Sequence, residues 1–192
     1  MTWVKFCGLR SAADVAAAVA AGANAVGFVT APGSIRQVSA AEANVFGAAT
    51  TLERFLVTMD QTPEELVGAA SVAGVTGVQP HGQFRFAAAQ AALEMGLSVL
   101  YPVSADDPGE VVPQGSIPII DGSVPGSGIL PDLSTLHAAT APFVIAGGLT
   151  PTNVGDICER YTPYGVDVSS GIEIERGIKD SELMNAFMRA IR

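Results

Sequence analysis

The stretch WVKFCGLRSAADVAAAVAAGANAVGFV, residues 3–29, contains the repeating unit from which the fold can be predicted. It begins and ends with short apolar runs, residues 3–7 and 25–29, whose composition is typical of buried β-strands. Between them lies an alanine-rich segment of helical length, and Ser11 stands immediately before it, as a helix N-cap does. The stretch therefore predicts a strand, a helix and a second strand.

The same alternation continues through the rest of the chain. Further apolar runs that predict strands occupy residues 54–59, 76–79, 97–103, 117–121, 142–146 and 164–168. Segments with helical patterning occupy residues 62–74, 86–96, 151–161 and 180–192, and N-caps are predicted at Thr62, Thr150 and Asp180. About eight strand–helix units predict an α/β protein with a parallel (β/α)8 barrel, the TIM barrel, formed by residues 1–192 as a single domain.

The predicted barrel must be compact, because TIM barrels usually have about 250 residues and this chain has 192. Residues 104–116 contain no convincing helical pattern, so the fifth helical segment is expected to be short or irregular. An open, doubly wound parallel sheet is the alternative architecture. Against it, no predicted strand is followed by the glycine-rich phosphate-binding sequences of dinucleotide- or nucleotide-binding folds.

Composition and charge argue against several classes of protein. With 48% hydrophobic and 15% charged residues, the chain is typical of a folded globular protein. The net charge of −9 argues against a nucleic-acid partner, and local groups would have to attract an anionic ligand. The two cysteines, Cys7 and Cys158, lack metal-ligand spacing, so no metal is predicted. The N-terminus lacks a leader-like pattern and the apolar runs are too short to cross a bilayer, so we expect a cytoplasmic protein without membrane contact.

Catalytic and binding residues of TIM barrels lie where the strands end and the following loops begin. Reading those positions gives the candidate site residues Cys7, Arg36, Gln79, His81, Asp121, Gly147, Gly148, Asp167, Ser169, Ser170 and Gly171. They comprise a thiol, carboxylates, a guanidinium and two loops of small residues with unshielded N–H groups. Such a set fits a phosphorylated, acidic small-molecule substrate.

Seven short motifs, taken in order, resemble those of the phosphoribosylanthranilate isomerase family of tryptophan biosynthesis. They are VKFCGLR (4–10), PGSIRQVS (32–39), GVQPHG (77–82), IIDG (119–122), GSG (126–128), VIAGGLTPTNV (144–154) and YGVDVSSGIE followed by GIKD (164–180). Together they span residues 4 to about 180, nearly the whole chain. The resemblance implies a (β/α)8-barrel enzyme that isomerises N-(5-phosphoribosyl)anthranilate by an Amadori rearrangement without a cofactor.

The resemblance also implies roles for individual residues. It makes Asp121 the general acid and Cys7 the general base, and it makes Arg36 the group that binds the anthranilate carboxylate. The substrate is also expected to contact Gln79, His81 and Asp167. Its phosphate is expected to bind to the two loops of glycine and serine, at Gly147–Gly148 and at Ser169–Gly171. Either a monomer or a homodimer is compatible with the sequence.

Strand alternation alone also predicts the surroundings of Cys7, independently of the family resemblance. Side chains alternate along a strand, so Trp3, Lys5 and Cys7 share one face. If that face is the barrel interior, the Lys5 ammonium lies one layer beneath the thiol and favours the thiolate, the form that acts as a base. The alternative is that Cys7 is a small buried hydrophobic residue.

Other candidates also have purely structural interpretations. Asp121 followed by Gly122 is a common hairpin dipeptide, although burial at a strand end would raise the pKa of Asp121 toward that of a useful acid. For Asp167 the sequence favours a structural ion pair with Lys5 over orientation of the reacting groups, and Arg36 is compatible with a solvated surface position. The two loops of small residues could close tight turns without binding a ligand.

Two departures from the family pattern affect specificity rather than the acid–base pair. Pro80 stands where leucine is usual in Gln-Leu-His-Gly, and the sixth loop, from Pro125 to Leu133, has an altered sequence. The sequence therefore leaves open whether the aminoimidazole substrate of the histidine pathway is also accepted. Alternative functions are another phosphosugar enzyme on the same barrel and a non-catalytic relative that binds a phosphorylated metabolite.

Overall fold

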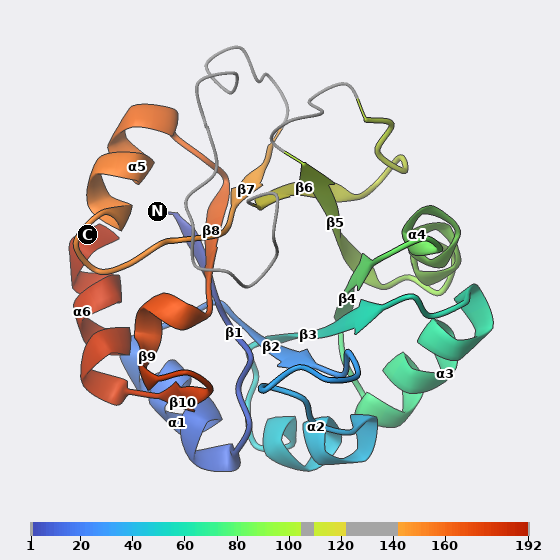
Figure 1. Ribbon diagram of the computed structural model, residues 1–192, viewed down its shortest axis with the longest axis horizontal. Coiled ribbons are helices and arrows are strands. Elements are labelled where there is room, and N and C mark those ends of the chain that lie inside the picture. The colour runs from blue at the N-terminus through green and yellow to red at the C-terminus, as the bar shows by residue number, and fades with distance from the viewer. Residues whose placement is uncertain (1, 105–109, 122–141, 192) are drawn as a thin grey trace.

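The computed structural model describes residues 2–104, 110–121 and 142–191, and it confirms the predicted parallel barrel. Its strands are β1 (Trp3–Cys7), β2 (Ala25–Val29), β3 (Glu53–Met59), β4 (Gly77–His81), β5 (Ser98–Ser104), β6 (Ile117–Asp121), β7 (Val144–Ile145) and β8 (Gly165–Val168). Each strand pairs in parallel with the next, and β1 closes the barrel against β8 with Lys5 opposite Asp167. Figure 1 shows the helices arranged around the outside of this closed sheet.

Six α-helices are present in the described parts of the chain. They are α1 (Ala12–Ala21), α2 (Ala40–Gly47), α3 (Pro63–Ala73), α4 (Arg85–Glu94), α5 (Val154–Tyr161) and α6 (Ser181–Ile191). The predicted N-caps at Ser11, Thr62 and Asp180 are confirmed, because the side chain of each accepts a hydrogen bond from an N–H of the first helical turn. Helix α2 was not predicted from the sequence, although Ser39 and Glu42 form a capping box at its start.

The predicted cap at Thr150 is wrong, because α5 begins only at Val154. Residues 151–153 form a turn in which the Asn153 side chain accepts a hydrogen bond from the Thr150 N–H and donates one to the Gly148 carbonyl. Asn153 thereby supports the loop after β7 instead of leaving Thr150 to begin a helix.

Strand alternation divides the apolar side chains into two cores. Outward-facing residues such as Val4, Phe6 and Val26 pack with the helices in the larger core. The smaller core fills the barrel and consists of Ala25, Phe55, Leu100, Ile119, Val144 and Ala146. Trp3 packs against this interior group and Lys5 is fully buried, so the face that carries Cys7 points into the barrel.

Strand glycines make room for the large interior side chains. A Cβ on Gly27 would meet Lys5 and Cys7, and a Cβ on Gly77 would overlap the ring of Phe55. Large and small residues must alternate around a closed barrel if its interior is to be filled without overlap. Gly27 therefore leaves room for Lys5 inside the barrel, and Gly77 leaves room for Phe55.

The irregular fifth segment is confirmed where the structure describes it. Residues 110–116 are not helical, and Glu110 accepts hydrogen bonds from Arg85 and from the Tyr101 hydroxyl. Residues 105–109 and the predicted sixth loop from Pro125 to Leu133 lie outside the described residues. At Pro80, β4 remains paired with β3, but its pairing with β5 reaches only Val78.

A short hairpin follows the barrel and was not predicted. After β8, a 3-10 turn, Ser170–Ile172, leads into β9 (Glu173–Glu175) and β10 (Ile178–Lys179), which pair antiparallel. Figure 1 shows this hairpin before α6, on the side of the barrel where β1 and β8 meet. Among the described residues, none of the helices has the combination of length and apolar composition that crossing a membrane requires.

Candidate active site

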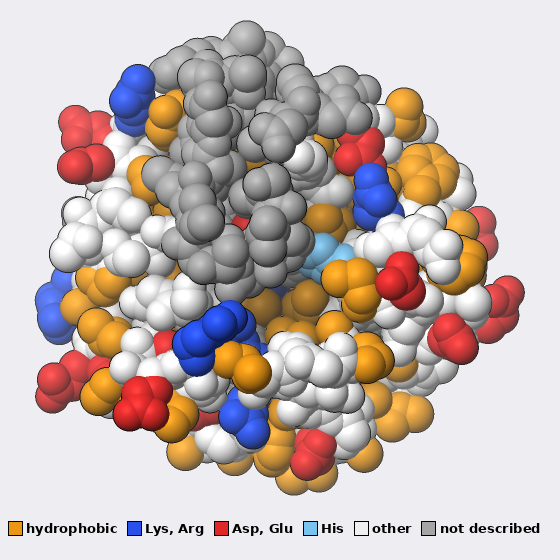
Figure 2. All heavy atoms as spheres, viewed as in Figure 1, with side chains coloured by type: hydrophobic (Ala, Val, Ile, Leu, Met, Phe, Trp, Pro, Cys, Tyr) orange, Lys and Arg blue, Asp and Glu red, His pale blue; other side chains and the backbone are white. Residues whose placement is uncertain are grey.

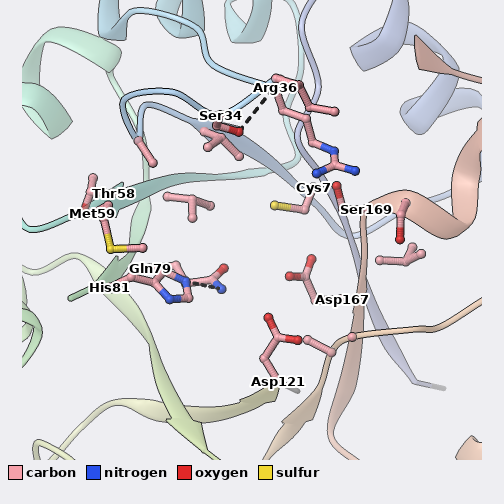
Figure 3. Close-up of a pocket in the computed structure, with 18 of the residues that line it drawn as sticks. Cys7, Ser34, Arg36, Thr58, Met59, Gln79, His81, Asp121, Asp167 and Ser169 are labelled. Carbon is pink, nitrogen blue, oxygen red and sulfur yellow. Dashed lines mark hydrogen bonds between the residues drawn. The ribbon is translucent and has the colours of Figure 1, made fainter. Parts of the chain in front are cut away.

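A cavity of about 440 Å³ opens at the carboxyl ends of the barrel strands. Ten of the eleven predicted site residues line it, namely Cys7, Arg36, Gln79, His81, Asp121, Gly147, Gly148, Asp167, Ser169 and Ser170. Figure 3 shows the labelled side chains converging on one space from several strands and loops. Residues far apart in the sequence therefore form one site, as expected if strand ends supply the chemistry.

Cys7 lies at the end of β1, and the Lys5 ammonium is close enough to affect the pKa of its thiol. Burial raises that pKa, Lys5 lowers it and Asp167 raises it, and the net result is a pKa above the usual value. The expectation that Lys5 favours the thiolate is confirmed in direction, but the effect of Lys5 is smaller than that of burial, so the thiol is the resting form. The physical reason is that burial penalises the thiolate more than one cation, itself paired with Asp167, can offset.

Lys5 connects the two sides of the site through hydrogen bonds. Its Nζ donates to Asp167 Oδ2 at 3.0 Å and to Gln79 Oε1 at 2.8 Å. Burial lowers the pKa of Lys5, but Asp167 and Cys7 raise it, and the net shift is upward. Lys5 therefore remains a cation, and the predicted ion pair with Asp167 is confirmed.

The same chain of hydrogen bonds fixes the tautomer of His81. Because Gln79 Oε1 accepts from Lys5, Gln79 Nε2 must donate to His81 Nε2, 3.2 Å away. His81 then carries its proton on Nδ1. Burial, followed by repulsion from Lys5 and Arg85, lowers the pKa of His81 to about 4. This histidine is therefore neutral at neutral pH and lines the cavity without supplying charge.

Two carboxylates face the cavity from neighbouring regions of the barrel. Figure 3 shows Asp121 and Asp167 directed toward the space occupied by the Cys7 thiol. Asp121 ends β6, which pairs in parallel with β5 and β7, whereas Gly122, the second residue of the possible hairpin dipeptide, lies outside the described residues. Asp167 is buried, and its Oδ1 has no hydrogen-bond partner among the described residues. This oxygen can accept a hydrogen bond from a hydroxyl group of a ligand.

The two predicted phosphate loops meet at the edge of the cavity. Gly147 and Gly148 both have positive φ, at 80° and 62°, a conformation that favours glycine and can leave backbone N–H groups uncovered. In the other loop, Ser169 and Ser170 line the cavity. Gly171 does not, because it packs against the Leu149 carbonyl, where a side chain would not fit. Gly171 thus joins the two loops instead of lining the site.

Arg36 is buried against an acidic partner, Glu173, that was not predicted from the sequence. Its Nε and Nη2 donate to Glu173 Oε1 and Oε2 at 2.6 and 2.8 Å, so the interpretation of Arg36 as a solvated surface charge is wrong. Lys179 Nζ also donates to Glu173 Oε1, at 2.7 Å. Both residues belong to the GIE and GIKD motifs that carry the family resemblance, and no local pattern marks them as a pair.

Further residues complete the lining of the cavity. The cavity is also lined by four residues that were not predicted from the sequence, Ser34, Thr58, Met59 and Arg176, which lie on neighbouring strands and loops. Figure 2 shows basic side chains near the opening and a histidine recessed within the hollow. The local groups that could attract an anion are thus present although the chain carries a net charge of −9. Within the described ranges, no group of three or more His, Cys, Asp or Glu side chains is placed to hold a metal ion.

Known proteins match this chain over nearly its whole length. A family model described as N-(5'phosphoribosyl)anthranilate (PRA) isomerase matches residues 4–190. An N-(5'-phosphoribosyl)anthranilate isomerase from Halobacterium salinarum is 37% identical over 206 residues, which cover 98% of this chain and 94% of the relative.

Solved structures show the same relationship. The crystal structure of phosphoribosyl anthranilate isomerase from Thermus thermophilus has a TM-score of 0.87 and 30% identity, covering 98% of each chain. A phosphoribosyl anthranilate isomerase in complex with reduced 1-(o-carboxyphenylamino)-1-deoxyribulose 5-phosphate has a TM-score of 0.84 and 26% identity, covering 100% of this chain and 98% of the other. With its sequence matched from residue 4 to 190 and its barrel shared with these enzymes, the chain belongs to the phosphoribosylanthranilate isomerase family.

Proposed function

We propose that this chain isomerises N-(5'-phosphoribosyl)anthranilate to 1-(2-carboxyphenylamino)-1-deoxyribulose 5-phosphate in tryptophan biosynthesis. The observation that carries the proposal is the convergence of Cys7, Asp121, Arg36 and the two small-residue loops on one cavity. A relative in this family has been solved with a reduced form of the product, which indicates the kind of ligand that such a barrel holds.

The reaction needs one acid and one base. Protonated Asp121 donates its proton to the furanose ring oxygen, the bond from that oxygen to C1 breaks, and the nitrogen lone pair forms an iminium at C1. The Cys7 thiolate then removes the proton from C2, and the C–H electron pair forms the C1–C2 double bond of an enolamine. Transfer of a proton from the C2 hydroxyl to C1 completes the ketone. Because C1 is reduced while C2 is oxidised, the atoms and electrons balance within the substrate and the proposed mechanism uses no cofactor.

The remaining groups are proposed to hold the substrate. Arg36 binds the anthranilate carboxylate, and Asp167 Oδ1, which lacks a partner among the described residues, accepts a hydrogen bond from a sugar hydroxyl. The loops at Gly147–Gly148 and Ser169–Ser170 bind the phosphate. Gln79 and neutral His81 line the wall beside the reacting carbons.

A turnover assay tests this proposal against its alternatives. Purified protein should convert N-(5'-phosphoribosyl)anthranilate, and the fall in substrate fluorescence reports the rate. The aminoimidazole substrate of the histidine pathway, assayed side by side, measures specificity through the ratio of the kcat/KM values. Binding of the substrate without turnover would instead support the non-catalytic alternative.

The phosphate loops give a first prediction. A crystal grown in phosphate should hold an anion between the Gly147–Gly148 loop and the loop at Ser169 and Ser170. Gly148→Ala should weaken the binding of inorganic phosphate by about tenfold, because a side chain strains the left-handed conformation and misdirects an N–H that bonds a charged ligand. Gly96→Ala is the matched control, since Gly96 also has positive φ, at 76°, but lies outside the cavity. An empty loop region in phosphate-grown crystals, or equal effects of the two substitutions, would contradict the prediction.

Arg36 gives a second prediction. Arg36→Ala should raise KM by about 10- to 100-fold, because a charged hydrogen bond to the substrate carboxylate is lost, while kcat changes much less. The carboxylate is remote from C1 and C2, so this contact stabilises the ground state and the transition state about equally. Arg36→Lys should recover only part of the loss, since lysine lacks the planar fork. Arg160→Ala, on the outer helix α5, is the control, and a large fall in kcat with unchanged KM for Arg36→Ala would refute this role.

A further inference from the structure

Three charged side chains form a buried cluster beside the cavity. Arg36 comes from the loop after β2, whereas Glu173 and Lys179 come from the hairpin after β8. The side chains of Arg36, Glu173 and Lys179 are only 8%, 3% and 1% exposed. We call these three residues the ion triad.

Glu173 lies at the centre of the ion triad. One of its oxygens accepts hydrogen bonds from Arg36 Nε and Lys179 Nζ, and the other accepts from Arg36 Nη2 and from the Gly177 N–H. The carboxylate therefore holds the side edge of the guanidinium, formed by Nε and Nη2. The end edge, formed by Nη1 and Nη2, carries N–H groups that this contact does not use, and a second carboxylate can bind there bidentately.

Lys179 extends the ion triad to the phosphate loop. Its Nζ donates to the Ser169 carbonyl at 2.9 Å and to Ser169 Oγ at 3.2 Å. Gly8 leaves room for this arrangement, because a Cβ there would lie 2.5 Å from Arg36 Cδ and 3.0 Å from Ser169 Oγ. One continuous set of hydrogen bonds thus connects the guanidinium with the loop proposed to bind phosphate.

Stability alone is a poor reason to bury three charges. The free energy of desolvating an ion pair is commonly as large as the free energy of attraction between its charges. Proteins in which a buried ion cluster is replaced by apolar residues are therefore often equally stable. A buried cluster does, however, fix its members in one geometry, which solvated side chains would not keep. Glu173 and Lys179 connect Arg36 with Ser169, and both Arg36 and Ser169 line the cavity. The fixed geometry of the cluster therefore bears on ligand binding.

We propose that Glu173 is a positioning residue that orients Arg36 directly and the Ser169 loop through Lys179, and so sets the spacing between the carboxylate and phosphate subsites. The proposal rests on the proposed function, because it assigns those two subsites to the two ends of one substrate. Glu173 itself touches neither the substrate nor the reacting atoms in this scheme. Substrates whose carboxylate and phosphate lie at a different spacing would be bound less well.

The effect of geometry can be separated from the effect of charge. If Glu173 only neutralises its cationic neighbours, Glu173→Asp keeps the charge and restores binding. If Glu173 sets a spacing, the aspartate is one methylene too short to hold Arg36 and Lys179 together, and Glu173→Asp remains impaired. Both variants are compared with Glu175→Gln, a control on the same short strand whose side chain is exposed.

The experiment measures each subsite separately and then the whole substrate. Binding of anthranilate and of inorganic phosphate is followed by NMR titration, and KM and kcat are measured with N-(5'-phosphoribosyl)anthranilate. Glu173→Gln and Glu173→Asp are expected to weaken both ligands by about tenfold and to raise KM more than they lower kcat, since misplaced binding groups weaken binding of the ground state and of the transition state about equally. Folded variants that bind both ligands as Glu175→Gln does, or an aspartate variant that recovers fully, would overturn the proposal.

A second variant decides the case if changes at Glu173 prevent folding. Lys179→Met keeps the length of the side chain and leaves Arg36 paired with Glu173. It should weaken phosphate binding by about tenfold and leave anthranilate binding within twofold of wild type, because the link to Ser169 is lost together with one hydrogen bond to Glu173, whereas both hydrogen bonds between Arg36 and Glu173 remain. Equal loss of both ligands, or no loss, would overturn the proposal. Failure of the proposed function has a different signature, since the wild-type protein would then lack turnover while these fragment-binding differences could still be measured.

Discussion

Cys7→Ser is expected to lower kcat by about 10²- to 10⁴-fold, the range typical for loss of a general base. A serine hydroxyl keeps nearly the size of the thiol but does not ionise near neutral pH, so it cannot remove the C2 proton. KM should change little, because Cys7 is not proposed to bind either charged end of the substrate. Steady-state kinetics with N-(5'-phosphoribosyl)anthranilate measures the effect, and circular dichroism with thermal unfolding checks that the variant is folded.

The raised pKa of Cys7 adds a signature in pH. Since burial holds the pKa of the thiol above its usual value of 9.0, the neutral thiol predominates at neutral pH and the thiolate fraction rises tenfold per pH unit. Alkylation of Cys7 by iodoacetamide, followed by mass spectrometry of the peptide, should accelerate in the same proportion up to the pKa. With a thiol of raised pKa as the base, the alkaline limb of the kcat/KM profile is expected to report Cys7, with only a minor protonation state of the acid–base pair being active.

Cys158 provides the matched control. It lies on α5, is half-buried, and its thiol pKa is likewise raised by burial, but it does not line the cavity. Cys158→Ser should leave kcat unchanged. A folded Cys7→Ser variant with turnover near that of Cys158→Ser would remove Cys7 from the mechanism.

Much of the fold could be predicted because local patterns specify it. The strands at residues 3–7, 25–29 and 117–121 appear at the predicted bounds, since a parallel strand covered on both faces is a short apolar run. Ser11 and Thr62 have the side-chain oxygen and spacing of helix caps, which depend only on neighbouring residues. Helix α2 was missed because its short sequence, AAEANVFG, has little contrast between apolar and polar faces.

The candidate site was predictable only as far as strand ends reveal it. Cys7, Asp121 and Asp167 each close a buried strand or lie near its end, so topology alone brings them together. The contact between Arg36 and Glu173 joins residues 137 positions apart, and the hairpin that carries Glu173 has no strong local signal. No pattern within a short window predicts such a pair.

The direction of the pKa shift of Cys7 could not be predicted from the sequence for a different reason. Sequence alternation correctly placed Lys5 beside the thiol, but it gave no measure of desolvation. In the structure Cys7 is 7% exposed and Lys5 is shared with Asp167 and Gln79, so burial outweighs the cation. Which of two opposing effects prevails depends on three-dimensional burial rather than on which residues are neighbours.

Asp121→Asn is the second substitution with a large expected effect. The amide cannot donate a proton to the ring oxygen, so opening of the furanose should slow and kcat should fall by about 10²- to 10⁴-fold. Asparagine has nearly the same shape, and Asp121 is only half-buried, so the fold should tolerate the change. Asp156→Asn, an exposed position on α5, is the control for loss of one negative charge.

Isotope effects on kcat can distinguish the role of the acid from that of the base, because the two groups act in different steps. If Asp121 acts in ring opening and Cys7 in removal of the C2 proton, a substrate deuterated at C2 should report which step limits each variant. Cys7→Ser should show a primary isotope effect on kcat, because proton removal has become the slow step, whereas Asp121→Asn should show an effect near unity, because ring opening precedes it. The double variant should lose less activity than the product of the two single losses. Once one step is strongly slowed and limits the rate, slowing the other step lowers the overall rate little further. A large isotope effect in Asp121→Asn would mean that ring opening proceeds without this carboxyl, and the general acid would then have to be sought among the other groups that face the cavity.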